Sequence, residues 1–229
     1  MFSQATMQIR EALYGIWART RDGDVIHHST GTGFMIAPGI IITNSHVLHR
    51  KGGAGDPRHS EFLAIRSLDV GKNAEVASLV AEDRDRDIAC LRIENPRSIR
   101  CVALEDRLVQ SGTNMGSLGF PLSTIQHKED GDVYNLIERF QGAYVSALFT
   151  DNVAMRQIKW YEVDREMYEG SSGCPGYLTD GKVVAVNCKV RREEDEDESV
   201  PLEKRPRLEI SLWIPSTDVI QFARAHGVL

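Results

Sequence analysis

Three short stretches of the chain carry residue types that together can activate a serine hydroxyl. They are TNSHV, which contains His46, DIACL, which begins at Asp87, and GSSGCP, which contains Ser172. A serine hydroxyl is a poor nucleophile at neutral pH, so it needs a base that takes its proton and an acidic group that holds this base in one tautomer. Histidine, aspartate and serine are the residue types that supply this chemistry.

The segments around these residues resemble a known family. Residues 31–36 and 40–47 are similar to the strand, turn and histidine segment of trypsin-like serine peptidases, specifically the HtrA (DegP-like) branch. Further similar segments are residues 87–89, 117–121, 142–148, 170–175, 181–187 and 213–216. A lone GxSG string is a weak signal, but these segments follow the family's order along nearly the whole chain. The order His, Asp, Ser is also that of the double-barrel serine peptidases, and differs from the orders in subtilisin and the α/β-hydrolases.

The resemblance implies catalytic roles for His46, Asp87 and Ser172. Ser172 matches the nucleophile, while Ser171 stands where the family usually has Asp or Asn. His46 matches the base, which suits a side chain with an unperturbed pKa of about 6.5. Asp87 matches the acidic group, because it directly precedes an apolar run, unlike its rivals in the DRDRD string at positions 83 and 85.

Residues Gly170, Ser171 and Ser172 match the family's oxyanion hole, where the backbone amides of Gly170 and Ser172 are expected to donate. Cys174 replaces a glycine of the family pattern. If that position needs a backbone conformation open only to glycine, the side chain would strain the loop or hold it in an inactive form. Regulation by ordering of this loop is therefore an expectation. Cys174 itself is out of register for a nucleophile.

The family layout also implies the substrate-binding residues. Glu166 and Met167 are expected to wall the primary pocket, with Cys188, Lys189 and Val190 opposite, where an extended substrate would pair as an added strand. Glu166 would favour a basic side chain if it pointed into the pocket. The cost of burying an unpaired carboxylate favours a solvent-facing Glu166, which leaves the small aliphatic preference of this branch.

The resemblance implies protein or peptide substrates as partners, with an activating protein as a further possibility. A net charge of −6 argues against nucleic acid, because phosphate-backbone binding requires a concentrated basic surface. No run of about 18 apolar residues and no secretory signal pattern occur, so we expect a soluble, cytoplasmic protein without membrane contact. The four cysteines lack CxxC spacing, and no metal or cofactor is expected.

Short Val- and Ile-rich segments bounded by Gly, Pro, Asn or Asp predict an all-β fold. They include residues 33–36, 40–43, 88–93 and 183–186. The resemblance implies two six-stranded antiparallel barrels in one peptidase domain over residues 1–229, without PDZ modules. The first would span roughly residues 10–105, and the second residues 106–215.

Two helices are expected at the ends of this domain. Residues 4–13 place Ile9, Ala12 and Leu13 on one face, and a C-terminal helix within residues 216–229 would be capped by Ser216 or Thr217. The glycine pair at positions 31 and 33 matches no phosphate-binding string and is expected in a strand or turn.

The remaining charged and titratable residues are expected at the surface. Most of the six other histidines are predicted to be solvated; they are His27, His28, His49, His59, His127 and His226. The acidic run at residues 193–198 predicts an exposed loop, although it could instead attract basic substrates or a partner. Two functions stay open, an active serine endopeptidase and a degenerate relative that acts as a binding or regulatory module. The intact His, Asp and Ser set favours the enzyme.

Overall fold

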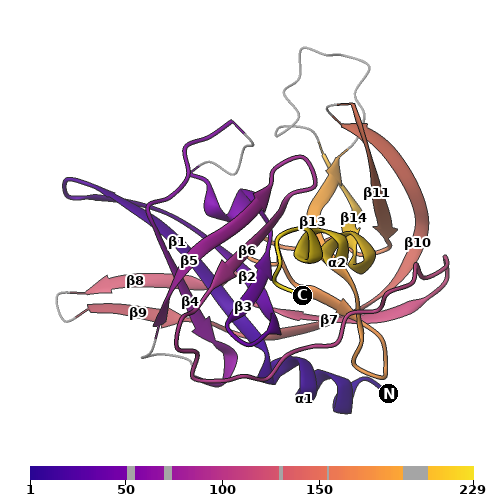
Figure 1. Ribbon diagram of the computed structural model, residues 1–229, viewed down its shortest axis with the longest axis horizontal. Helices are drawn as coiled ribbons and strands as arrows, with labels where there is room; N and C mark the ends of the chain where they lie inside the picture. Colours follow the sequence, from indigo (N-terminus) through magenta and orange to yellow (C-terminus); the bar gives the residue numbers. More distant parts are fainter. Residues whose placement is uncertain (51–54, 70–73, 129–130, 154, 193–205) are drawn as a thin grey trace.

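The computed structural model describes residues 1–50, 55–69, 74–128, 131–153, 155–192 and 206–229, which form two antiparallel β-barrels side by side (Figure 1). The acidic run at 193–198 and part of the loop that follows His49 lie outside the described residues. No described helix is both long and apolar enough to span a bilayer.

The first barrel closes in the order β1-β2-β3-β6-β5-β4. Its strands are β1 (Leu13–Asp22), β2 (Val25–Ala37), β3 (Ile40–Thr43), β4 (Glu61–Arg66), β5 (Ala74–Asp83) and β6 (Ile88–Arg92). Strand β3 is buried along its whole length, which agrees with the apolar run of Ile40, Ile41 and Ile42. Gly39 has a φ of +76° and makes the tight turn between β2 and β3 possible.

The second barrel closes in the order β10-β11-β14-β13-β12-β7. Its strands are β7 (Asn114–Gly119), β10 (Arg139–Val153), β11 (Arg156–Val163), β12 (Pro175–Tyr177), β13 (Val183–Arg192) and β14 (Arg207–Pro215). A separate hairpin of β8 (Thr124–Lys128) and β9 (Gly131–Asn135) extends along the first barrel to the left in Figure 1, and its Asp132 pairs with Arg19 at 2.8 Å. The all-β prediction with two six-stranded barrels is confirmed.

Two helices lie at the ends of the chain, as predicted, but with different bounds. Helix α1 (Ser3–Glu11) ends before Leu13, which begins β1 instead, since its side chain is buried in the barrel. Helix α2 (Ser216–Ala225) starts without a side-chain cap. The capping prediction is wrong because the Ser216 hydroxyl donates to the carbonyl of Glu105 at 2.6 Å, and Thr217 makes no capping bond.

The two glycines of β2 allow its backbone to approach its neighbours. A Cβ at Gly31 would lie 2.6 Å from the Val47 side chain and 3.1 Å from the carbonyl oxygen of Ser172, and a Cβ at Gly33 would lie 2.8 Å from Ile41. Glycine at position 31 therefore lets the first barrel contact the serine loop of the second barrel directly.

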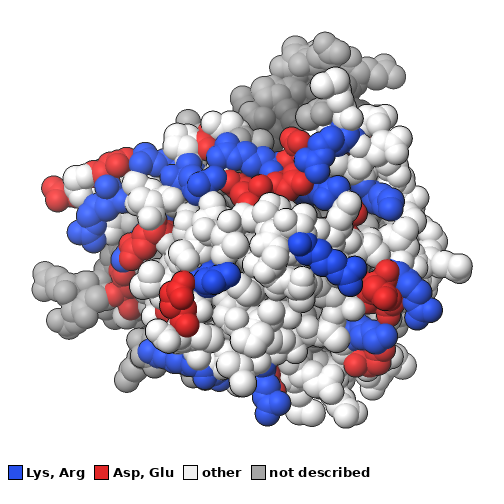
Figure 2. Space-filling view, in the orientation of Figure 1, with Lys and Arg blue, Asp and Glu red and all other residues white. Residues whose placement is uncertain are grey.

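The face of the molecule drawn in Figure 2 carries interspersed basic and acidic side chains, with large areas that carry neither. Phosphate-backbone binding requires a concentrated field of positive charge. This face offers no such field.

All four cysteines are free, and three of them are buried. Cys174 is 2% exposed and its backbone is not in the positive-φ region, so the strain expected from the missing glycine is not found. Its side chain instead occupies the space above Gly119 of β7, where a Cβ would lie 1.9 Å from the Cys174 sulfur and 2.9 Å from the hydroxyl of Thr32. The Cys174 side chain therefore fills the volume that the missing side chain of Gly119 leaves.

This complementarity predicts that Gly119→Ala destabilises the fold by about 1 to 3 kcal/mol, because a well-packed core resists added volume. Chemical denaturation measures the change. Gly142→Ala is the matched control, since the nearest atom to its Cβ is 4.0 Å away. Adding Cys174→Ala to Gly119→Ala should recover part of the loss. Additive effects of the two substitutions would contradict the proposed contact.

Candidate active site

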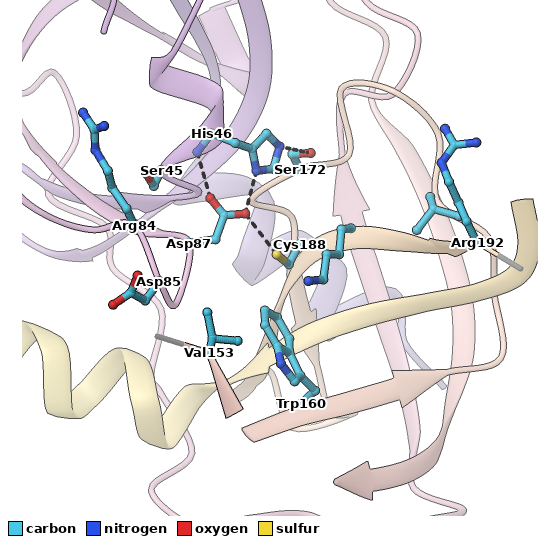
Figure 3. Close-up of a pocket in the computed structure, with 12 residues that line it drawn as sticks. Ser45, His46, Arg84, Asp85, Asp87, Val153, Trp160, Ser172, Cys188 and Arg192 are labelled. Carbon is cyan, nitrogen blue, oxygen red and sulfur yellow. Dashed lines mark hydrogen bonds and ion pairs between the residues drawn. The ribbon is translucent and has the colours of Figure 1, made fainter. Parts of the chain in front are cut away.

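The structure brings His46, Asp87 and Ser172 into direct contact at the seam between the barrels (Figure 3). His46 begins a short 3-10 helix (His46–Leu48) after β3, and Asp87 lies in the turn between β5 and β6. Ser172 lies in the turn before β12. The His46 Nδ1 is 2.6 Å from Asp87 Oδ2, and its Nε2 is 2.8 Å from Ser172 Oγ.

Asp87 is held in a strained backbone conformation. Its φ is +57°, a region that a non-glycine residue adopts only when its surroundings hold it there. Asn44 donates its side-chain amide to the Asp87 carbonyl at 3.0 Å, and the backbone N–H of His46 donates to Oδ1 at 2.8 Å. The thiol of Cys188 donates to Oδ2 at 3.0 Å. These bonds fix the carboxylate against the imidazole.

The two rival aspartates lie elsewhere. Both Asp83 and Asp85 pair with Arg156 of the second barrel, at 3.0 Å and 3.3 Å. They therefore anchor the turn that carries Asp87 and do not contact His46.

The carboxylate of Asp87 also sets the protonation of His46. An oxygen that only accepts requires a proton on Nδ1, which leaves the Nε2 lone pair directed at the Ser172 hydroxyl. Burial by itself lowers the pKa of His46, but the charge and hydrogen bond of Asp87 outweigh it, so the pKa is raised above 6.5. The positive charge of Lys189 opposes part of this rise.

The loop that carries Ser172 is tied to both barrels. Thr32 of β2 donates its backbone N–H to the Ser172 carbonyl at 2.7 Å and its hydroxyl to the Gly170 carbonyl at 2.9 Å. Asn187 of β13 donates its side-chain amide to the Ser171 carbonyl at 2.9 Å, and its own carbonyl accepts from Gly173. The φ values of Gly170 and Gly173, +89° and +84°, produce the tight turn that exposes the serine.

The backbone amides of Gly170 and Ser172 are oriented for anion binding. The Glu169 carbonyl accepts from Leu122 at 2.8 Å, so in this trans peptide the N–H of Gly170 points the opposite way. Within the described ranges, neither this N–H nor that of Ser172 has a hydrogen-bond partner. The inclusion of Ser171 in the oxyanion hole is wrong for this conformation, because its N–H already donates to the Tyr168 carbonyl at 2.9 Å.

A cleft of about 470 Å³ opens beside the three residues. Figure 3 shows the side chains that line it, which are Ser45, His46, Arg84, Asp85, Asp87, Val153, Trp160, Ser172, Cys188, Lys189, Val190 and Arg192. Of the predicted substrate-binding residues, Cys188, Lys189 and Val190 lie there.

The prediction for Glu166 and Met167 differs from the structure, since neither lines this cleft. Met167 is 2% exposed and belongs to an apolar cluster with Tyr161 and Trp213. Core packing therefore takes this side chain away from the cleft surface. Glu166 is partly exposed.

A buried charged cluster lies directly behind His46, and the sequence did not reveal it. Most histidines other than His46 are predicted to be solvated, but His49 and His59 are 0% and 3% exposed. The His49 Nε2 lies 2.5 Å from Glu82 Oε1, and its Nδ1 lies 2.8 Å from the Asp56 carbonyl. Each ring nitrogen of His49 thus faces an oxygen that accepts hydrogen bonds.

Glu82 connects this cluster to the catalytic segment. Ser45, the residue before His46, donates its hydroxyl to Glu82 Oε1 at 2.5 Å, and Arg58 binds Oε2. Burial alone raises the pKa of Glu82, but the hydrogen bonds from Ser45, His49 and Arg58 outweigh it and hold the pKa at about 2. No local pattern links positions 49 and 82, because barrel closure brings them together.

A comparison with family models matches residues 31–186 to the trypsin-like peptidase domain. The chain belongs to this family. Comparison with curated proteins gave no match.

Solved structures share the fold at low sequence identity. The active form of the Rv3671c protease from M. tuberculosis aligns over 98% of this chain and 85% of its own, with a TM-score of 0.70 and 15% identity. The HtrA-type protease AlgW with a tripeptide aligns over 99% of this chain, with a TM-score of 0.71 and 16% identity. A substituted form of AlgW with a tripeptide aligns over 100% of this chain, with a TM-score of 0.72 and 14% identity. The chain spans 64% of the length of both AlgW chains.

The depressed pKa of Glu82 predicts a stability contribution that depends on pH. A carboxyl with a folded pKa of about 2, against an ordinary 4.5, stabilises the fold above pH 4.5 and loses this effect as the pH falls toward 2. Glu82→Gln should therefore lower the free energy of unfolding by about 3 kcal/mol at pH 5, with a smaller difference at pH 3.

Denaturant unfolding of both proteins at several pH values measures this difference. Glu94→Gln, at an exposed position, is the control and should show no such trend. A constant difference between wild type and Glu82→Gln across this range would contradict the assignment of the low pKa.

Proposed function

We propose that this protein is a serine endopeptidase that cleaves protein or extended peptide substrates through an acyl-enzyme intermediate. The observation that carries the proposal is the unbroken hydrogen-bonded series from Asp87 through His46 to Ser172. The amides of Gly170 and Ser172, which have no hydrogen-bond partner among the described residues, support it, because they belong to the loop that carries this hydroxyl. Membership of the trypsin-like peptidase domain family agrees with this chemistry.

In this mechanism Ser172 Oγ attacks the scissile carbonyl while His46 Nε2 takes its proton. Asp87 stabilises the imidazolium that forms. The amides of Gly170 and Ser172 donate to the developing oxyanion, and each such donor contributes about 2.7 to 4 kcal/mol of transition-state stabilisation. His46 then returns the proton to the leaving amine, and a water molecule hydrolyses the acyl-enzyme by the same route.

An extended peptide fits the edge of β13 beside Ser172. Strand β12 pairs with β13 only as far as Val186, and β14 covers the other edge of the strand as far as Arg192. Within the described residues, the edge from Cys188 to Val190 is thus open for an added strand. The tripeptide in the AlgW structures supports an extended peptide as the substrate class.

Control by ordering of the serine loop is a further part of the proposal. Two positive-φ glycines, Gly170 and Gly173, give this loop the backbone freedom to adopt a second conformation. An activating protein partner would act by binding one of the two loop conformations more tightly.

The test of the nucleophile is labelling with a fluorophosphonate probe, read by intact mass. The wild-type protein should gain one adduct, and Ser172→Ala should gain none. Ser171→Ala is the matched control and should label like the wild type, because its hydroxyl does not contact His46. No adduct on the folded wild-type protein would instead favour a binding or regulatory module.

The raised pKa of His46 predicts the acid side of the pH profile. Catalysis needs the neutral imidazole, so kcat/KM should fall as the pH drops through a midpoint above 6.5. Asp87→Asn removes the charge that raises this pKa, while burial and Lys189 still lower it. The midpoint should therefore move below 6.5, and kcat should fall by about 10⁴.

Steady-state kinetics on a quenched peptide across the pH range measures both effects. A wild-type midpoint at or below 6.5, or a midpoint that Asp87→Asn leaves unchanged, would contradict the role of Asp87.

A further inference from the structure

We propose that Lys189 makes the cleft select substrates with an acidic side chain on the acyl side of the scissile bond, within a few residues of it. The inference rests on the proposed function, because it names the substrate class of the same cleft. It concerns a side chain that takes no part in the proton transfers described above.

Lys189 lies in β13 directly after Cys188, at an irregularity in the pairing of β13 with β14, and both side chains line the cleft. Cys188 reaches Asp87. Lys189 is exposed, lines the cleft with His46 and Ser172, and places its ammonium 4.7 Å from the centre of the Trp160 ring. An aromatic face attracts a cation without neutralising it, so the contact orients the ammonium within the cleft and leaves its charge for a substrate.

The charges around the cleft are not balanced. The cations Arg84, Lys189 and Arg192 line it, and the anions are Asp85 and Asp87. Asp87 is bound by His46 and Cys188, and Asp85 pairs with Arg156. Among the described residues Lys189 forms no ion pair. Arg84 pairs with Glu82 at 3.5 Å, whereas the ammonium of Lys189 is left for a bound carboxylate.

The effect of Lys189 on its neighbour agrees with this placement. Its charge lowers the pKa of His46, so the ammonium is near enough to act on the reacting groups. A basic substrate side chain at this place would be repelled, whereas an acidic one would gain an ion pair over a partly apolar surface formed by Val153, Trp160 and Val190.

The acyl-side assignment follows from the strand. The Gly173 N–H donates to the Asn187 carbonyl, so Cys188 is the end of the open edge nearer Ser172. A peptide that adds antiparallel, as β12 and β14 do, runs from Val190 toward Cys188, so the residues before its scissile carbonyl lie beside Lys189. Alternate side chains of such a peptide face the same surface, so the preference should be confined to one or two positions.

The experiment uses quenched peptides of one parent sequence that carry Asp, Asn or Lys at each of the four positions before the cleavage site. Wild-type kcat/KM should favour Asp over Asn by about 10-fold at one or two positions and should disfavour Lys there. Lys189→Glu should give a higher kcat/KM for the Lys peptide than for the Asp peptide at those positions. Added salt should weaken the preference of the wild-type protein and that of the variant. Ratios are compared at pH 8.5, where the change in the His46 pKa has little influence.

Lys159→Glu is the matched control. It changes the net charge by the same amount from β11, next to Trp160, but Lys159 does not line the cleft. This variant should keep the wild-type preference. Cleavage with no preference for Asp, or a preference that Lys189→Glu leaves unchanged, would overturn the inference.

A binding measurement distinguishes failure of the inference about Lys189 from failure of the proposed peptidase function. Fluorescence anisotropy with the Asp and Asn peptides on Ser172→Ala, and on the same variant with Lys189→Glu, reports the charge preference without cleavage. Preferential binding of the Asp peptide that Lys189→Glu abolishes supports the inference even if the wild-type protein shows neither cleavage nor a probe adduct. Equal binding of the two peptides contradicts it.

Discussion

The hydrogen bond between His46 and Ser172 joins two separately closed barrels, and the site depends on this contact. His46 and Asp87 come from the first barrel, and Ser172 comes from the second. A shift of about 1 Å between the barrels would break a 2.8 Å contact of this kind. The constraint on the fold is therefore the relative position of the barrels, more than the stability of either one.

Several contacts across the seam hold that position. Thr32 binds two carbonyls of the serine loop, and its own approach is possible because Gly31 lacks a Cβ. On the other side of the cleft, Arg156 of β11 pairs with Asp83 and with the residue two places before Asp87. Exposed ion pairs contribute little to stability individually. Here their effect is geometric, because they fix the turn in which Asp87 adopts a strained φ.

Much of the site was readable from the sequence because its residues sit in local strings with local consequences. The apolar IIIT string gave the bounds of β3, and the apolar run after Asp87 distinguished it from two rival aspartates. The contacts that lie behind these residues were not readable. His49 and Glu82 meet through the barrel register, and Cys174 fits above Gly119 only because β12 pairs with β7. Single-sequence patterns carry no information about such pairings.

The same limit explains the errors at Met167 and Leu13. Both are apolar residues near a boundary, and sequence alone does not tell whether a side chain turns toward a cleft or into a core. Leu13 is fully buried in the barrel and pairs with Phe34 of β2, so the strand begins there. At Met167 the cluster with Trp213 had the same effect.

Neighbouring residues of β13 link catalysis to substrate choice. Cys188 binds the Asp87 carboxylate, and the adjacent Lys189 lies in the open cleft. Burial raises the pKa of the Cys188 thiol well above its ordinary value, as does the charge of Asp87, so the sulfur stays protonated and donates to Oδ2. The positive charge of Lys189 in the cleft lowers the pKa of His46. A cation at this position therefore keeps more of the imidazole neutral, and it does so most effectively while no substrate carboxylate is bound. An acidic substrate would partly cancel this effect, which makes the basicity of His46 responsive to the ligand that the cleft holds.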